Sequence, residues 1–157
     1  MLVSLLSLLA TGASVLLFLS PWSEVKKAYQ LGSTRGQSAL PFVCMWANCA
    51  LWLLYGLQIK VSVIIVVNGT GAILSSFYTY VWIKITTATE RTQIVLCALS
   101  AVCFVSWAAL YSANLAGPYI ETNILPWIAT AVCVVMFASP LIAVVSIASF
   151  WGWMCRI

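Results

Sequence analysis

Long uncharged runs of apolar residues dominate the chain and alternate with short polar segments. No Asp, Glu, Lys or Arg occurs in residues 1–23, 36–59, 61–83, 92–120 and 122–155. A helix needs roughly 20 apolar residues to cross the hydrocarbon core of a bilayer, so each run has room for one crossing. The pattern predicts about five transmembrane helices, at approximately 2–20, 40–58, 61–83, 93–113 and 124–149.

The composition supports a membrane protein and excludes a soluble domain. Hydrophobic residues make up 64% of the chain and charged residues 6%, whereas a soluble domain carries about 25% charged residues. The strands of a membrane β-barrel alternate polar and apolar residues, but residues 61–67 are apolar on nearly every side. We therefore expect an all-α membrane protein. A cleaved signal peptide is the alternative for residues 2–20, and it is disfavoured because no Lys or Arg precedes this run.

The few charges predict an orientation in the membrane. Loops on the cytosolic side carry an excess of Lys and Arg. With the N-terminus outside, the inner segments carry six of the seven basic residues and the outer loops carry only Lys60. The chain is therefore expected to begin outside and end in the cytosol. A nucleic-acid partner is not expected, because the basic residues are scattered and form no stripe.

The connecting segments and the cysteines add little chemistry. Spans two and three are separated by a short turn around Lys60 and must be antiparallel neighbours. Segments 21–39 and 84–92 are predicted to be polar cytosolic loops, and 114–123 an outer loop. The cysteines lie in or beside apolar spans, as packing residues do, and the chain has no His. No metal, cofactor or enzymatic site is expected.

An ordered series of short motifs between Leu19 and Tyr80 resembles the first three-helix repeat of SWEET sugar transporters, the MtN3/saliva family. The motifs are Ser20-Pro21, Lys26-Lys27, Ser33-Thr34, Leu40-Pro41-Phe42, Trp52-x-x-Tyr55-Gly56 and Asn68-Gly69-Thr70-Gly71. The resemblance resumes at Ala138-Ser139-Pro140-Leu141, which is similar to the opening helix of the family's second repeat. A weak internal echo, Phe18 to Pro21 against Phe137 to Pro140, agrees with a parallel repeat.

This resemblance implies two three-helix bundles joined by a linker helix, with the sugar held between the bundles. It divides the chain into a first repeat at 1–84, a linker helix with its loops at 85–121, and the first helix of an incomplete second repeat at 122–157. The family pattern ends after Leu141. We therefore expect a chain that is truncated after its fifth span.

Two residues are the candidates for binding the sugar. Asn68 offers donors and an acceptor to sugar hydroxyls, and an amide in an apolar span needs partners. The resemblance assigns it to the sugar pocket, whereas a bond to a neighbouring helix is the structural alternative. The indole of Trp52 suits the C–H face of a pyranose, and the resemblance assigns it to the same pocket. Ordinary aromatic packing is the alternative for Trp52.

Five residues are candidates for gates or hinges. The resemblance implies hinge roles for Pro21, Pro41 and Pro140, because proline removes a backbone hydrogen bond and bends a helix. Pro21 and Pro41 could equally be ordinary breakers at span ends. The resemblance also implies outer-gate roles for Tyr55 and Lys60. A lysine that extends from a loop toward water is the alternative for Lys60.

Other polar, aromatic and small residues are given structural roles. Asn48 shares a helix face with Trp52 and Tyr55 and is expected to bond to another helix. Five small residues of span three predict a packing seam: Gly69, Gly71, Ala72, Ser75 and Ser76. Tryptophans near span ends are interpreted as interfacial anchors: Trp22, Trp82, Trp127, Trp151 and Trp153.

The expected function is facilitative, bidirectional transport of a mono- or disaccharide by alternating access. All three Glu residues lie outside the apolar spans, so proton or sodium coupling is disfavoured. Plasma membrane is the first expected location and Golgi the second, and a homo-oligomer or hetero-oligomer with related transporters is expected. One alternative is a truncated, non-transporting isoform that acts as a membrane interaction subunit for full-length relatives. Transport of other metabolites, as in the wider PQ-loop group, is weakened because no Pro-Gln dipeptide occurs.

Overall fold

The computed structural model describes residues 2–34, 36–115 and 124–134, and its regular structure within these ranges is entirely helical. The elements are α1 (Leu2–Leu19), α2 (Trp22–Leu31), α3 (Leu40–Ile59), α4 (Ser62–Ile85), α5 (Ala88–Leu115) and a further helix, Leu125–Val134. By length and apolar composition, α3, α4 and the Ala88–Ala113 part of α5 can cross a membrane. The chain is thus an all-α membrane protein, as predicted.

Each of the first four predicted spans coincides with a helix. The largest difference is at α5, which begins at Ala88 inside the predicted loop 84–92. Thr87 and Glu90 explain this start: the Glu90 carboxylate accepts from the Thr87 N–H at 3.3 Å, and the Thr87 hydroxyl accepts from the Glu90 N–H at 3.4 Å. This reciprocal arrangement is a capping box. Of the fifth predicted span, the structure describes only the helical part Leu125–Val134.

The prediction that residues 21–39 form a loop was wrong for α2. This helix of 10 residues buries only Val25 and Ala28, and the rest of its surface is polar or exposed. It ends at Gly32, whose φ of 61° is left-handed, and the Gly32 N–H reaches back to the Tyr29 carbonyl. Glycine takes this conformation without steric cost, which is why it commonly ends helices.

Helices α3 and α4 form a tight antiparallel hairpin, as the short turn predicted. Lys60 makes the connection in a left-handed conformation with φ of 57°. The two helices approach closely where they carry glycine: a Cβ on Gly56 would lie 2.9 Å from Ile64, and one on Gly71 would lie 2.6 Å from the Cys49 sulfur. The packing seam is therefore confirmed at Gly71, but Gly69 has open space around its Cα and Ser76 is exposed.

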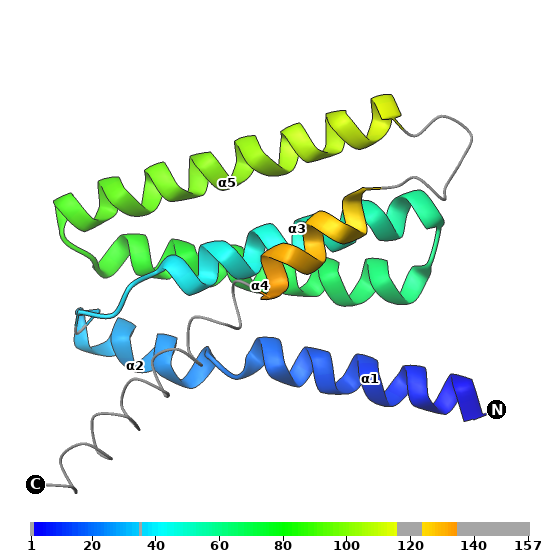
Figure 1. The fold of residues 1–157 in the computed structure, drawn as a ribbon. Coiled ribbons are helices and arrows are strands. Elements are labelled where there is room, and N and C mark those ends of the chain that lie inside the picture. Colours follow the sequence, from blue (N-terminus) through cyan, green and yellow to red (C-terminus); the bar gives the residue numbers. More distant parts are fainter. Residues whose placement is uncertain (1, 35, 116–123, 135–157) are drawn as a thin grey trace, which may run out of the picture.

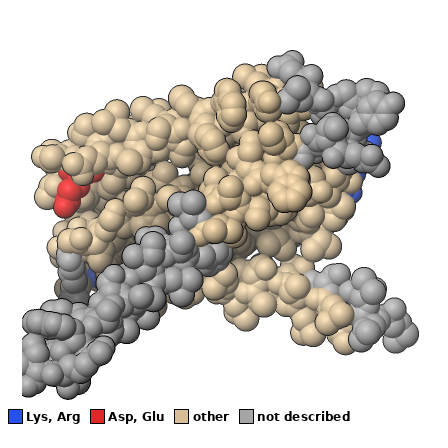
Figure 2. Space-filling model, viewed as in Figure 1, with Lys and Arg blue, Asp and Glu red and all other residues tan. Residues whose placement is uncertain are grey.

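The hairpin is the centre of the molecule, with α1 and α2 against α4 and with α5 against α3 (Figure 1). On the face seen in Figure 2, the described residues show few charged side chains, as expected for helices in lipid. Two buried clusters hold the bundle. One joins α2 to the end of α4 through Val25, Ala28, Tyr78 and Trp82. The other, described below, joins α3 to α5 and to Leu125–Val134.

Candidate functional site

Pro21 and Pro41 come from different parts of the chain but line one open groove of about 700 Å³, together with Glu24, Phe42 and Trp82. Pro21 stands between α1 and α2, and Pro41 lies in the first turn of α3. Both prolines therefore occupy helix ends, where a missing N–H costs no helical hydrogen bond. The structure brings the two predicted hinge residues together at one end of the bundle, which we call the proline end.

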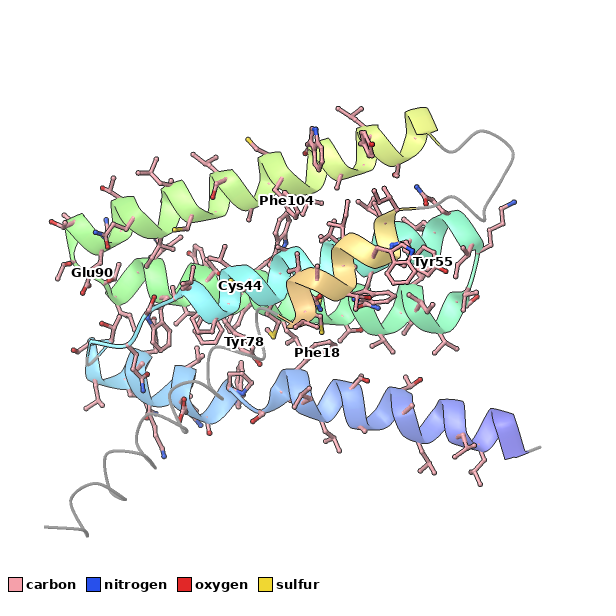
Figure 3. The ribbon with its side chains drawn as sticks, viewed as in Figure 1. Phe18, Cys44, Tyr55, Tyr78, Glu90 and Phe104 are labelled. Carbon is pink, nitrogen blue, oxygen red and sulfur yellow. The ribbon has the colours of Figure 1, made fainter. Side chains whose placement is uncertain are left out.

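Tyr78 fastens α1 at the proline end. Its hydroxyl donates to the Phe18 carbonyl at 3.0 Å, and its side chain is fully buried. Phe18 lies in the last turn of α1, where backbone carbonyls lose their helical partners. Figure 3 labels the two residues close together, between α1 and the α3–α4 hairpin. The Tyr78 hydroxyl thus gives a hydrogen-bond partner to the Phe18 carbonyl at the end of α1, just before Pro21.

Trp82 makes the equivalent bond to the segment before α3, because its indole N–H donates to the Gln37 carbonyl at 3.1 Å. The Phe42 ring packs between the two α4 aromatics, with its centroid 5.5 Å from Tyr78 and 5.2 Å from Trp82. Trp82 is only 1% exposed. Its interpretation as an interfacial anchor was therefore wrong, whereas Trp22 and Trp127 are exposed.

Sequence reasoning missed the role of Tyr78 and Trp82. The two residues are one helical turn apart, on the α4 face that also carries Gly71 and Ser75. That small-residue face was recognised as a seam. Following it by 3.6-residue steps to the end of the helix would have identified both aromatic side chains as inward-facing.

Trp52 and Tyr55 lie at the opposite end of the bundle, near the α3–α4 turn, which we call the turn end. Their rings are 5.9 Å apart and meet at 75°, edge to face. Both side chains are partly buried against an apolar cluster from α3, α5 and Leu125–Val134. Its buried members are Ala47, Leu51, Val105, Ala108, Leu125 and Ala129. Figure 3 places Tyr55 in this region.

Asn68 of α4 is partly buried, and its amide nitrogen donates to the Ile64 carbonyl at 2.9 Å within the same helix. This bond differs from the interhelical contact that was the structural alternative. Trp52 precedes Lys60 by eight residues and Asn68 follows it by eight. At 1.5 Å per residue, both lie about 12 Å from the turn. The hairpin therefore holds the two predicted sugar-binding residues at the same depth.

The side-chain oxygen of Asn48 does not make the bond that the sequence suggested for this residue. Asn48 shares the α3 face of Trp52 and Tyr55, but its side-chain oxygen is buried without a hydrogen-bond partner among the described residues. The expected bond to another helix is therefore not made through this atom. A buried acceptor without a partner costs free energy. A donor brought by water or by a ligand would remove that cost.

The remaining predicted gate residues have separate surroundings. The Lys60 side chain is exposed at the turn, and its left-handed backbone closes α3 by donating its N–H to the Gly56 carbonyl. Near the same end, the Gln58 amide donates to the Ser112 hydroxyl at 3.1 Å and links α3 to α5. Pro140 lies outside the described residues.

Within the described ranges, no group of three His, Cys, Asp or Glu side chains comes together in a way that could hold a metal. The five described cysteines are free thiols. Cys49 is buried against Gly71, so its expected packing role is confirmed, whereas Cys97 and Cys103 are exposed. The candidate residues that the structure describes offer hydrogen bonding by amides and contact with aromatic rings.

The sequence of the chain is similar to a family of known proteins. Residues 4–90 match the family model MtN3_slv, described as "Sugar efflux transporter for intercellular exchange". The chain is 29% identical over 143 residues to the bidirectional sugar transporter SWEET4 of Oryza sativa, covering 87% of this chain and 54% of the relative. It is 33% identical over 130 residues to SWEET2a of Sorghum bicolor, covering 80% and 53%.

An animal relative and a solved structure agree with these matches. The sugar transporter SWEET1 of Drosophila pseudoobscura is 30% identical over 138 residues, covering 87% of this chain and 61% of the relative. A eukaryotic SWEET transporter structure superimposes with a TM-score of 0.77 at 26% identity, covering 92% of this chain and 72% of that one. The chain spans about half the length of the first curated relatives it matches. By the match over residues 4–90, this chain belongs to the MtN3/saliva family of sugar transporters, the SWEET family.

Proposed function

We propose that the chain takes part in facilitative, bidirectional transport of a mono- or disaccharide by alternating access. The observation that carries the proposal is the groove that both Pro21 and Pro41 line. The two prolines lie at helix ends within the residues that match the family, so bends at both places can change the same groove. The chain belongs to a family of transporters and not of enzymes. In the proposed orientation the N-terminus lies outside and the C-terminus in the cytosol, in the plasma membrane first and the Golgi membrane second.

The proposed sugar pocket is built on the α3–α4 hairpin. Asn68 and Trp52 lie at equal distances from the turn. In the proposed pocket, the amide and the indole therefore contact the same sugar at one depth in the membrane. The amide supplies hydrogen bonds to hydroxyl groups and the indole an apolar plate for the ring. The unpartnered oxygen of Asn48, one helical turn before Trp52, adds an acceptor to this pocket. A sugar hydroxyl would satisfy it.

The proposed gates lie at the two ends of the bundle. Tyr55, packed against Trp52, and Lys60, at the turn, form the outer gate. Pro21 and Pro41, with Pro140, form the inner hinges. Glu24 and Glu90, the acidic residues among those described, lie in the first turns of α2 and α5 and not in mid-span. This position disfavours proton or sodium coupling and supports facilitated diffusion.

The first test is uptake of radiolabelled glucose and sucrose by cells that lack their own hexose carriers and express residues 1–157. The proposal is supported if uptake is saturable, does not depend on a proton gradient and is lost in Asn68→Ala. Ser76→Ala is the matched control, because Ser76 is an exposed α4 residue that bonds only its own helix in the same way. Full uptake by Asn68→Ala at equal surface expression would rule out the proposed pocket.

Oligomerisation, with itself or with related transporters, is part of the proposal. Phe104, Trp107 and Tyr111 form an exposed stacked row along α5, with centroids 6.2 and 5.3 Å apart. Such a row can be covered by a second helix. Co-purification of two differently tagged copies, weakened by Trp107→Ala, would support it. Absent uptake combined with retained co-purification would favour the second function, a membrane interaction subunit that does not transport.

A further inference from the structure

A second groove, of about 310 Å³, lies between α2 and α4 and is separate from the proline groove. Trp22, Val25 and Tyr29 of α2 form one side of it, and Phe77 and Tyr80 of α4 form much of the other. None of these five residues was assigned a binding role above. The groove is at the small end of the range seen for small-molecule sites.

The groove has a buried apolar floor and exposed aromatic walls. Val25 is only 2% exposed, whereas Tyr29 is 63% and Tyr80 57% exposed. At its edge the rings of Trp22 and Phe77 stack with centroids 5.9 Å apart, which ties the wall of α2 to that of α4. Exposed apolar patches of this kind mark interaction sites. The shape is an open, apolar groove.

Among the residues that the structure describes, the charged side chains beside this groove are two lysines. Lys26 lines it, and the Lys84 ammonium lies 5.3 Å from the centroid of the Tyr80 ring that forms its wall. Of the acidic residues that the structure describes, Glu24 lines the grooves on the other side of α2, and Glu90 lines a pocket beside α5. An apolar channel bordered by two lysines is complementary to a molecule with an acyl chain and an anionic head.

The depth of the groove agrees with such a molecule. Phe77 lies eight residues before the end of α4 at Ile85, which is about 12 Å along the helix. Lys84 is at that end. The channel therefore runs from the last turn of a membrane-spanning helix toward the hydrocarbon region. Aromatic and basic side chains are enriched at this level of a bilayer.

We propose that this groove binds one anionic phospholipid, with an acyl chain along the Val25 floor and the headgroup phosphate held by Lys26 and Lys84. In the orientation proposed above, the lipid belongs to the cytosolic leaflet, where anionic lipids are enriched. Binding requires only that this end of the bundle meets a leaflet. It does not require that the chain moves sugar, so the two proposals can fail separately.

The test is lipid binding to the purified chain in mild detergent, measured by native mass spectrometry with phosphatidylserine and phosphatidylcholine at matched concentrations. The expected result is preferential retention of one phosphatidylserine. Lys26→Gln and Lys84→Gln should each weaken it about fivefold, the loss corresponding to one basic residue at an anionic surface. Phe77→Ala should weaken retention of both lipids, because it removes a wall.

Lys27→Gln is the matched control, because Lys27 is exposed on the same helix and lines the groove beside Glu24 instead. Its phosphatidylserine retention should stay within twofold of the wild type. Equal retention of the two lipids, or an equal loss in Lys27→Gln and Lys26→Gln, would overturn the proposal in favour of general surface attraction. Displacement of the lipid by glycerophosphoserine alone would also overturn it, because the acyl chain would then contribute nothing.

Discussion

The two ends of the α3–α4 hairpin are held by different kinds of interaction. At the proline end, Tyr78 and Trp82 reach across to backbone carbonyls of Phe18 and Gln37. At the turn end, Trp52 and Tyr55 pack against an apolar cluster, and the Gln58 amide bonds to the Ser112 hydroxyl. Hydrogen bonds have a fixed geometry, whereas apolar contacts tolerate sliding.

This difference bears on where a conformational change can begin. The bonds from Tyr78 and Trp82 are directional and can be broken or made as discrete steps, and they lie three to four residues before Pro21 and Pro41. The apolar contacts of the turn end can shift gradually, although a movement there must keep or break the Gln58–Ser112 bond. The proline end is therefore suited to switching between two states, and the turn end to adjusting around a ligand. Four substitutions test this contrast.

Trp82→Ala should have the largest effect on stability. It removes a buried ring and leaves the Gln37 carbonyl without its donor, and core Trp→Ala changes cost about 3–5 kcal/mol. We expect a clearly lowered midpoint in thermal unfolding of the detergent-solubilised chain. Trp127→Ala is the control, because Trp127 is 77% exposed and should change the midpoint little. Similar midpoints for both variants would contradict the buried position of Trp82.

Tyr78→Phe keeps the ring and deletes only the bond to α1. The expected loss is about 1 kcal/mol, the usual net value of a hydrogen bond. The more specific readout is alkylation of a cysteine introduced at Ser20, beside Pro21. Its rate should rise in Tyr78→Phe if the bond holds the end of α1. Tyr80→Phe, on the exposed side of α4, should leave that rate unchanged.

Gln58→Leu should have a smaller effect at the turn end. It deletes the bond to Ser112, and interhelical side-chain bonds in membranes contribute about 0.6 kcal/mol on average. The midpoint of unfolding should fall slightly, and a Gln58→Leu, Ser112→Ala double variant should lose little more than Gln58→Leu alone. Losses that simply add in the double variant would show that the two side chains do not interact.

Lys60→Gly should have the smallest effect on folding, with unchanged or slightly raised stability. Glycine adopts the left-handed φ of 57° without steric cost, so the turn is preserved while the charge is removed. Sugar uptake then separates the two roles of this residue. Reduced uptake with normal stability would support the outer-gate role of the side chain, whereas normal uptake would leave Lys60 only as the turn residue.

The sequence predicted the helices that carry long uncharged apolar runs, because uninterrupted apolar length is what the membrane requires. It did not predict α2, whose buried face is only Val25 and Ala28 among charged neighbours. It could not indicate that Pro21 and Pro41 share a groove, because that depends on how α1, α2 and α3 pack. The inward position of Trp82 was missed because nearness to a span end suggested the interface.

For the candidate site, too, some positions could be predicted from the sequence and others could not. Asn68 and Trp52 could be placed at one depth by counting from Lys60, because a hairpin converts sequence distance into spatial distance. Asn48 could not, because the absence of a partner for a buried oxygen is a property of all the helices around it. The roles proposed for Asn68, Trp52 and the gate residues remain predictions for the uptake assay.

The left-handed turn at Lys60 also limits the mechanics of the molecule. A connection this short leaves no slack, so α3 and α4 cannot slip past each other by a helical turn, and the tight seats of Gly56 and Gly71 oppose rotation. The two helices are therefore expected to move together as one rigid unit. Any rocking movement must then use the boundaries on either side of it, where α1 meets α4 and where α5 meets α3.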